Sequence, residues 1–210
     1  MLLESKNNCT PSGFSPDGRR LAYSELKPDG DIDLWTLPID TSDPEHPKPG
    51  KPAPFLQTPA IEAVLVFSPD GRYVAYFSNE SGGWEVYVRP APGLDGKPGP
   101  GKWQISTGGI SSYPVWSPNG RELFFRAAPH IAVADYTETG GSFSSNKPRL
   151  WSNREIGQFG LYSPFALAPD GKHFAVTPAP EAAAQDKGPA HVTFLQNFFD
   201  ELRRRVPAGK

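Results

Sequence analysis

The sequence has one cysteine, almost no excess of charge and no long hydrophobic run. Cys9 alone cannot form an internal disulfide or a cysteine-based metal cluster. The longest apolar runs, such as residues 63–67 and 123–125, are far shorter than the roughly 18 residues that a membrane-spanning helix needs. The first residues lack a basic segment followed by an apolar stretch, so no signal peptide is expected. We therefore predict no membrane insertion by this chain.

Nucleic-acid binding is not expected either. The formal charge is only −2, from 21 basic and 23 acidic residues, and the basic residues are scattered along the chain. The broad positive field that attracts nucleic acid is therefore missing.

Motifs for catalysis are also absent. The chain contains no Gly-x-Ser-x-Gly and none of the phosphate-binding or catalytic loops of protein kinases. Its four histidines, His46, His130, His173 and His191, lie in a proline-rich loop or in or beside expected strands. We predict no catalytic residue, no metal site and no cofactor.

Proline and glycine are abundant by contrast. The 25 prolines and 21 glycines together make 46 of 210 residues, about 22%, where average usage gives roughly 12%. Such a chain turns often and forms few helices.

One five-residue motif occurs four times. It ends in Pro, then Asp or Asn, then Gly, and its copies are Phe14–Gly18, Phe67–Gly71, Trp116–Gly120 and Leu167–Gly171. The four glycines are separated by 53, 49 and 51 residues. A period of about 50 matches one four-stranded blade of a β-propeller and is too long for leucine-rich or tetratricopeptide repeats.

The motif has the chemistry of a tight turn. Proline presets φ at the second turn position, Asp or Asn suits the third, and glycine accepts the left-handed conformation that closes a bulged hairpin. We assign these structural roles to Pro16, Asp17, Gly18, Pro69, Asp70, Gly71, Pro118, Asn119, Gly120, Pro169, Asp170 and Gly171.

A strand is expected after each turn. Apolar residues stand at the third and fifth positions after each glycine, as in Val74 and Tyr76, which is typical of a strand with one buried face. The intervening position is Ala22, Ala75, Phe124 or Ala175. These mostly small side chains would let neighbouring sheets approach closely.

The sequence therefore predicts an all-β propeller of about four blades, each with four antiparallel strands, and a short C-terminal α-helix. The blade boundaries are 11–57, 61–106, 112–152 and an incomplete 161–195, with the helix at 196–206. Third strands are expected at 32–37, 84–88 and 130–134. Proline-rich segments 43–54 and 90–101 are interpreted as exposed loops, with polyproline ligands as the alternative. Four blades indicate a partial, open ring or a compact four-bladed one.

Two local patterns allow a second interpretation. Asp29, Asp31 and Asp33 alternate as in a calcium-assisted turn, although the EF-hand pattern fails and an ordinary hairpin turn explains them. The apolar stripe of residues 194–206 would cover an exposed sheet edge or dock onto a partner.

These patterns resemble a known family. Residues 67–89, with Ser-Pro-Asp-Gly-Arg followed by Tyr-Val-Ala-Tyr, are similar to the PD40, or TolB-like, propeller repeat. Residues 84–93, 102–106, 114–117, 121–125 and 196–207 look like the C-terminal region of bacterial membrane-anchored serine/threonine kinases that carry such a propeller. That resemblance implies an extracytoplasmic or periplasmic location, and a kinase domain outside this chain.

The expected function is a non-catalytic module that binds a protein or peptide partner or senses a ligand. Open blade edges would also permit self-association. The alternative is the propeller part of a prolyl-oligopeptidase-type serine peptidase without its hydrolase domain. The final residues 203–210 are expected to be a chain end, which favours the first interpretation.

Overall fold

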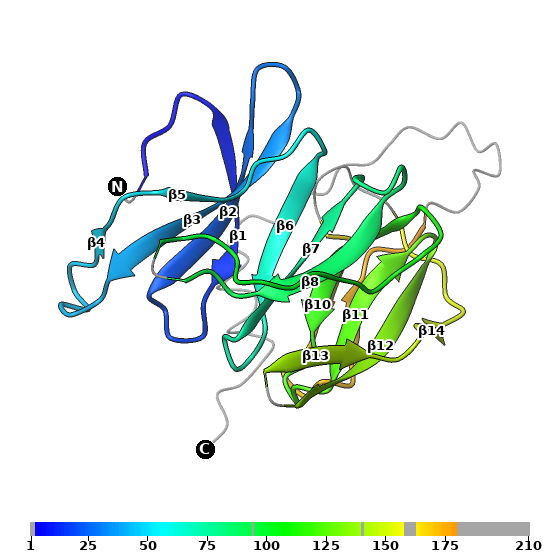
Figure 1. Ribbon diagram of the computed structural model, residues 1–210. Helices are drawn as coiled ribbons and strands as arrows, with labels where there is room; N and C mark the ends of the chain where they lie inside the picture. Colours follow the sequence, from blue (N-terminus) through cyan, green and yellow to red (C-terminus); the bar gives the residue numbers. More distant parts are fainter. Residues whose placement is uncertain (1–2, 94, 140, 158–162, 180–210) are drawn as a thin grey trace, which may run out of the picture. The chain divides into compact units, whose positions relative to one another are not determined.

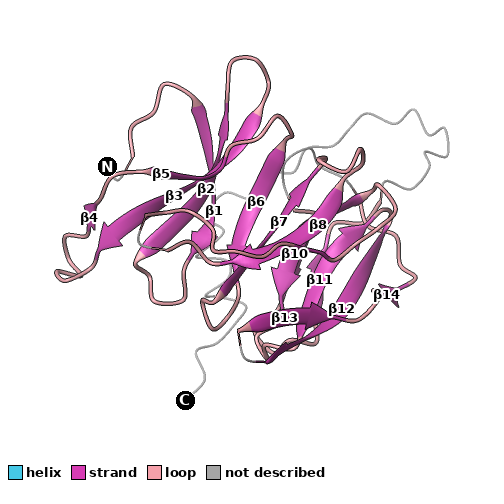
Figure 2. Ribbon diagram, in the orientation of Figure 1, coloured by secondary structure: helices cyan, strands magenta, loops and turns pink. Residues whose placement is uncertain are grey.

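The computed structural model describes residues 3–93, 95–139, 141–157 and 163–179 (Figure 1). These ranges consist of antiparallel strands joined by turns and loops, and they contain no helix that could cross a bilayer (Figure 2). The helix expected at 196–206 and the strand expected at 191–195 lie outside the described residues, as does His191.

The strands form four sheets that follow one another along the chain, which we number as blades 1 to 4. Blade 1 contains β1 (Asn8–Phe14), β2 (Arg20–Leu26), β3 (Ile32–Asp40), β4 (Lys48–Pro49) and β5 (Ala53–Leu56). Blade 2 contains β6 (Glu62–Phe67), β7 (Tyr73–Ser78), β8 (Glu85–Pro90) and β9 (Trp103–Gln104). Blade 3 contains β10 (Ser111–Trp116), β11 (Glu122–Ala127), β12 (His130–Thr139), β13 (Ser142–Ser145) and β14 (Arg149–Ser152). The described part of blade 4 is β15 (Phe165–Leu167) and β16 (Phe174–Val176).

Each repeated turn joins the first two strands of a blade. The pairs β1–β2, β6–β7, β10–β11 and β15–β16 are all antiparallel hairpins closed by Ser-Pro-Asp-Gly or a close variant. Sequential hairpins of this kind build one small sheet per repeat. The all-β, propeller-type fold that the 50-residue period predicts is confirmed.

The second strand of blades 2 and 3 is buried on both faces, because a neighbouring sheet packs on each side of it, as the mostly small side chains on its second face allow. In β7, Val74 and Tyr76 belong to a core shared with blade 1, whereas Tyr73, Ala75 and Phe77 belong to a core shared with blade 3. A strand between two stacked sheets has no face in contact with solvent. Alternate residues of such a strand therefore point to one neighbouring blade or to the other.

Blades 1 and 3 carry a hairpin extension that the sequence analysis missed. Strands β3 and β12 continue past residues 37 and 134 and pair with the short strands β4 and β13. The described residues of 90–101 are exposed or half-buried except Gly96, which is buried, and a β-carbon built on Gly96 would lie 2.3 Å from Cβ of Ala53. This loop of blade 2 therefore packs against blade 1.

Candidate functional site

The turns of blades 1 and 2 have the same pattern of hydrogen bonds. In blade 1 the Ser15 hydroxyl donates to Asp17 Oδ1 at 2.6 Å, and the same oxygen accepts the Arg19 N–H at 3.1 Å. In blade 2, Ser68, Asp70 and Arg72 repeat these bonds at 2.6 and 3.1 Å. The Asp side chain thus organises the turn from within.

All four turn glycines adopt the left-handed conformation. Their φ angles are +70° for Gly18, +73° for Gly71, +66° for Gly120 and +69° for Gly171. A residue with a β-carbon would be strained there, which is why glycine ends the motif.

Hydrogen bonds to the turn carboxylates lower their pKa values. The Ser15 hydroxyl is the main cause for Asp17, and the Lys172 backbone N–H is the main cause for Asp170, whose pKa falls to about 2. Burial alone would raise the pKa of Asp70, but bonds from Ser68 and Arg72 outweigh it and the net shift is downward. These carboxylates stay charged at neutral pH.

Neighbouring turns lie close together. A β-carbon built on Gly71 would lie 3.5 Å from Pro16 Cδ, and one built on Gly171 would lie 3.6 Å from Pro118 Cδ. The turns of blades 2 and 3 do not meet in this way. The atom nearest to a β-carbon built on Gly120 is the Tyr136 hydroxyl oxygen, at 3.9 Å. A cleft opens at this point.

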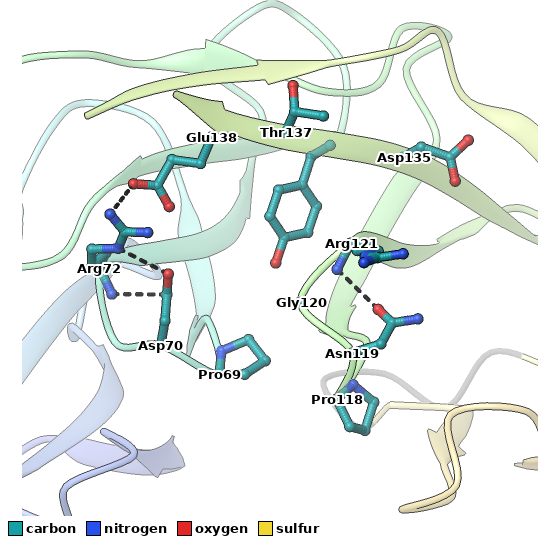
Figure 3. Close-up of a pocket in the computed structure, with 11 residues that line it drawn as sticks. Pro69, Asp70, Arg72, Pro118, Asn119, Gly120, Arg121, Asp135, Thr137 and Glu138 are labelled. Carbon is teal, nitrogen blue, oxygen red and sulfur yellow. Dashed lines mark hydrogen bonds and ion pairs between the residues drawn. The ribbon is translucent and has the colours of Figure 1, made fainter. Parts of the chain in front are cut away.

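This cleft, which we call the turn cleft, has a volume of about 770 Å³ and lies between the turns of blades 2 and 3. Figure 3 shows one strand, β12, carrying Asp135, Thr137 and Glu138 across from the two turns. Its described lining is Pro69, Asp70, Arg72, Pro118, Asn119, Gly120, Arg121, Asp135, Tyr136, Thr137 and Glu138.

Aromatic rings pack at and behind Tyr136. Tyr136 stacks on Phe143, with centroids 5.2 Å apart, and meets Trp116 edge-on at 5.0 Å. Phe143 in turn contacts Tyr73 and Trp103 of blade 2, at 5.2 and 5.4 Å. Burial raises the pKa of Tyr136 to about 12, and the carboxylates of Asp70 and Glu138 contribute. The phenol therefore remains a neutral hydrogen-bonding group.

The rim of the turn cleft is charged but mostly self-paired. Arg72 forms ion pairs with Asp70 and with Glu138, so it ties blade 2 to the hairpin extension of blade 3 (Figure 3). Asp135 is paired with Arg149 at 2.6 Å. Within the part of the chain that the structure describes, the exposed Arg121 guanidinium has no ion-pair or hydrogen-bond partner.

A second cleft of about 560 Å³ lies beside the turns of blades 1 and 2. It is lined by Pro16, Asp17, Asp70 and Gly71 together with Arg20, whose guanidinium donates to the Gly93 carbonyl oxygen at 3.2 Å. The two clefts share Asp70. Residues of three of the four repeated turns thus line this pair of clefts, whereas no described lining residue of either cleft comes from the turn of blade 4.

Tyr136, Thr137 and Glu138 were not predicted as site residues, because the third strand expected in blade 3 ended at Ala134. The alternation of apolar and polar residues continues from Ala134 to Tyr136, and this pattern could have extended the predicted strand. The other missing element was β13, whose Ser142–Ser145 sequence is short and polar.

The alternating aspartates form a turn held by a lysine. The Lys27 ammonium lies 2.8 Å from carboxylate oxygens of both Asp31 and Asp33, and Asp29 accepts the Asp31 N–H at 3.1 Å. The hydrogen bond to Asp31 is the main reason that the pKa of Lys27 is raised. The charge that a calcium ion would supply comes from this side chain, which favours the ordinary turn.

The described histidines lie apart from both clefts. His46 pairs with Asp43 in an exposed loop, His173 pairs with Asp170 beside the blade 4 turn, and His130 faces the Arg154 carbonyl oxygen at 3.4 Å. None of them approaches a serine in a nucleophile–base arrangement among the described residues.

Comparison with solved structures shows the fold. A protein assigned as a 6-phosphogluconolactonase from Bacteroides uniformis matches with a TM-score of 0.53 and 19% identity, over 80% of this chain and 48% of that one. A second such protein, from Bacteroides fragilis, has a TM-score of 0.48 and 21% identity over 79% and 46%. A protein assigned as TolB from Agrobacterium tumefaciens has a TM-score of 0.47 and 20% identity over 67% and 50%.

The chain spans about half the length of these solved structures. At such identities the likeness concerns the fold and not the activity. No family model and no curated protein matches the sequence.

Proposed function

We propose that this chain is a non-catalytic propeller module that binds a protein or peptide partner at the turn cleft. The observation that carries the proposal is the composition of the cleft: an aromatic side chain, Tyr136, beside a rim of charges in which Arg121 alone lacks a partner among the described residues. Tyrosine and arginine are the side chains most often responsible for binding energy at protein interfaces.

Rigidity of the cleft supports the same conclusion. Tyr136 is held by Phe143 and Trp116, and β12 is tied to blade 2 by the Arg72–Glu138 ion pair. A preformed site loses little conformational entropy on binding. An extended segment lying along β12 could place an acidic group at Arg121 and an apolar side chain against Tyr136.

Peptide display on the immobilised full chain tests this proposal. We expect recovered peptides to bind the unmodified chain, and Arg121→Ala to weaken that binding about tenfold, which corresponds to about 1.4 kcal/mol. Arg154→Ala is the matched control, because Arg154 is exposed and lies outside both clefts. Equal binding by both variants would remove the turn cleft from the proposal.

Catalytic turnover by the chain would overturn the proposal that the module is non-catalytic. The direct assay is hydrolysis of 6-phosphogluconolactone and of peptide substrates by the chain, with a heat-denatured sample as control. Turnover above the control would contradict the proposal. We expect none, since no described histidine approaches a serine nucleophile.

As part of the same proposal, we place the module in a larger bacterial receptor-like kinase or TolB-like protein. The kinase-like sequence segments support this placement, and so does the half-length coverage of the solved structures. The coding sequence on both sides of this chain distinguishes the alternatives. A kinase and membrane helix upstream would agree with the proposal, whereas a hydrolase domain downstream would favour the peptidase.

A further inference from the structure

The first strand of each of blades 1 to 3 contains one extra residue. Relative to its partner strand, the register shifts between Pro11 and Gly13 in β1, between Ala63 and Val66 in β6, and between Ser112 and Val115 in β10. Such bulges redirect side chains and occur preferentially at functional sites. Here they recur at the same place in three successive blades.

Two of the bulges hold a residue in a disfavoured backbone conformation. Val64 has a φ of +57° and Tyr113 a φ of +52°, and no other described residue except glycine has a positive φ. This region is rare for a bulky tyrosine and more so for a β-branched valine. The Ser24 hydroxyl helps to hold Val64 by accepting its N–H at 3.2 Å.

Both of these residues line one pocket of about 210 Å³, which we call the bulge pocket. First strands of three blades and the approach to the fourth meet there. Its described lining is Thr10, Pro11, Ser12, Ser24, Leu26, Ile32, Ala63, Val64, Tyr113 and Ser163. Residues in strained conformations cluster at ligand-binding positions, and here both strained residues belong to one pocket.

The bulge pocket contains no charged side chain among its described lining residues. Arg126, the charged group that acts on Tyr113, is not one of them. Leu26, Ile32, Ala63 and Val64 provide an apolar wall. A charged ligand would lose its hydration there and would meet no charged side chain of the described lining.

The polar groups of the pocket are hydroxyls, and two of them have capacity to spare. Ser163 donates to the Phe165 carbonyl oxygen at 2.7 Å, and Ser24 is engaged by Val64. The Thr10 and Ser12 hydroxyls, both on β1, have no partner within the described ranges. They can therefore bond one polar group of a ligand.

We propose that the bulge pocket binds an uncharged, mainly apolar ring compound about the size of indole. The ring would lie against Ala63, Val64 and Tyr113, and its single polar N–H or O–H would meet Thr10 or Ser12. The size follows from the volume, because an apolar cavity of about 150 Å³ accommodates benzene and this pocket is larger by roughly one further ring.

Ligand-observed NMR on the full chain tests the proposal with indole as the probe. We expect a Kd of about 1 mM or below, since small apolar ligands of this size reach such affinities in preformed pockets. Indole-3-acetate, which adds a carboxylate, should bind at least tenfold more weakly. Equal binding of the two compounds, or no binding of indole, would overturn the proposal.

Two variants locate the binding. Ala63→Leu fills the pocket and should abolish indole binding, with near-UV circular dichroism to check that the variant is folded. Thr10→Val removes a hydroxyl without changing shape and should weaken binding about threefold, whereas Thr139→Val, at a residue outside the bulge pocket, should not. Indole binding that survives both pocket variants unchanged would place it elsewhere and contradict the proposal.

Discussion

The joint between blades 1 and 2 and the joint between blades 2 and 3 bury equivalent carboxylates in different ways. Asp33 lies opposite Glu25 in blade 1, and Glu85 lies opposite Ser78 in blade 2. Glu25 and Ser78 each stand seven positions after the turn glycine of their blade, so Asp33 and Glu85 occupy the same position in the repeat. Glu85 has both oxygens bonded, one by the Ser106 hydroxyl and one by the Gly109 N–H at 2.6 Å. The loop that leads into blade 3 therefore wraps this carboxylate completely.

The carboxylates at the joint of blades 1 and 2 are less well satisfied. Gln57 and Lys27 both bond Oδ2 of Asp33, at 2.8 Å, and leave Oδ1 buried without a partner among the described residues. Glu62 is buried beside it and is bonded by Thr58 through only one oxygen. Burial raises the pKa of Glu62 to about 7, and the charges of Asp33, Asp31 and Glu80 contribute.

The comparison shows that the same position in the repeat can be electrostatically complete in one joint and incomplete in the next. The joint of blades 2 and 3 adds an aromatic cluster and an ion pair. We therefore expect it to dominate stability, and the joint of blades 1 and 2 to dominate the pH dependence.

The largest effect is expected from Trp116→Ala. Trp116 is 7% exposed, packs on Tyr136 and Phe143, and donates its indole N–H to the Val66 carbonyl oxygen at 3.1 Å. Its removal should lower the free energy of unfolding by about 3–5 kcal/mol, measured by urea denaturation. Trp84→Ala, at a half-exposed tryptophan, should cost about 1 kcal/mol. Similar losses from the two variants would contradict the contribution assigned to Trp116.

The second prediction concerns pH. The pKa of Glu62 is about 7 in the folded chain against an ordinary value of 4.5, so the folded state holds this proton more tightly. Its contribution is present in full below pH 4.5 and is lost as pH rises through 7. Between pH 5 and 8 the free energy of unfolding should fall by at most about 3 kcal/mol, at about 1.4 kcal/mol per pKa unit.

Glu62→Gln is the control for this prediction, because it cannot ionise and should flatten the profile. The turn aspartates do not interfere, since hydrogen bonds lower the pKa values of Asp17 and Asp170, away from the pH range of this measurement. A profile that remains equally steep in the variant would assign the effect to other groups.

The third prediction concerns the joint of blades 2 and 3, where both oxygens of Glu85 are bonded. Glu85→Ala leaves the Ser106 hydroxyl and the Gly109 N–H without their acceptor, and should cost about 1–3 kcal/mol. Glu80→Ala is the matched change at a more exposed carboxylate, which pairs with Lys102 at 2.7 Å, and should cost less than about 1 kcal/mol. Both are measured by chemical denaturation at pH 7, and the reverse order would contradict the comparison.

The smallest effect is a gain in stability from Asn119→Asp. The change is made in a chain that also carries Glu122→Gln. The Ser117 hydroxyl is buried without a partner among the described residues, whereas Ser15 and Ser68 bond the turn aspartates. The carboxylate introduced by Asn119→Asp would accept this bond and should add about 0.5–1 kcal/mol, visible as a higher melting temperature. The same change combined with Ser117→Ala should add nothing.

Much of the fold could be predicted because the turn motif acts locally. Pro, Asp and Gly determine the turn whatever surrounds it, and the alternation after Gly71 or Gly120 defines a strand. Tertiary features were not visible in this way. Burial of Ala75 and Val74 on opposite faces depends on two neighbouring blades, and the packing of Gly96 on Ala53 depends on a loop that crosses between blades.

The two candidate sites also differ in how far the local sequence predicts them. The turn residues of the turn cleft come from the repeat itself, whereas Tyr136 enters through a strand extension. The bulge pocket has no sequence motif, because Val64 and Tyr113 hold conformations that valine and tyrosine disfavour locally. Only the surrounding sheets hold these two residues there.

The most direct test of the central claim is amide hydrogen exchange on the full chain with and without a peptide selected by display. Binding at the turn cleft predicts slower exchange in residues 69–72, 118–121 and 135–138, with the rest of the described chain unchanged. Slower exchange confined to other segments, such as the proline-rich loop at 43–54, would contradict it.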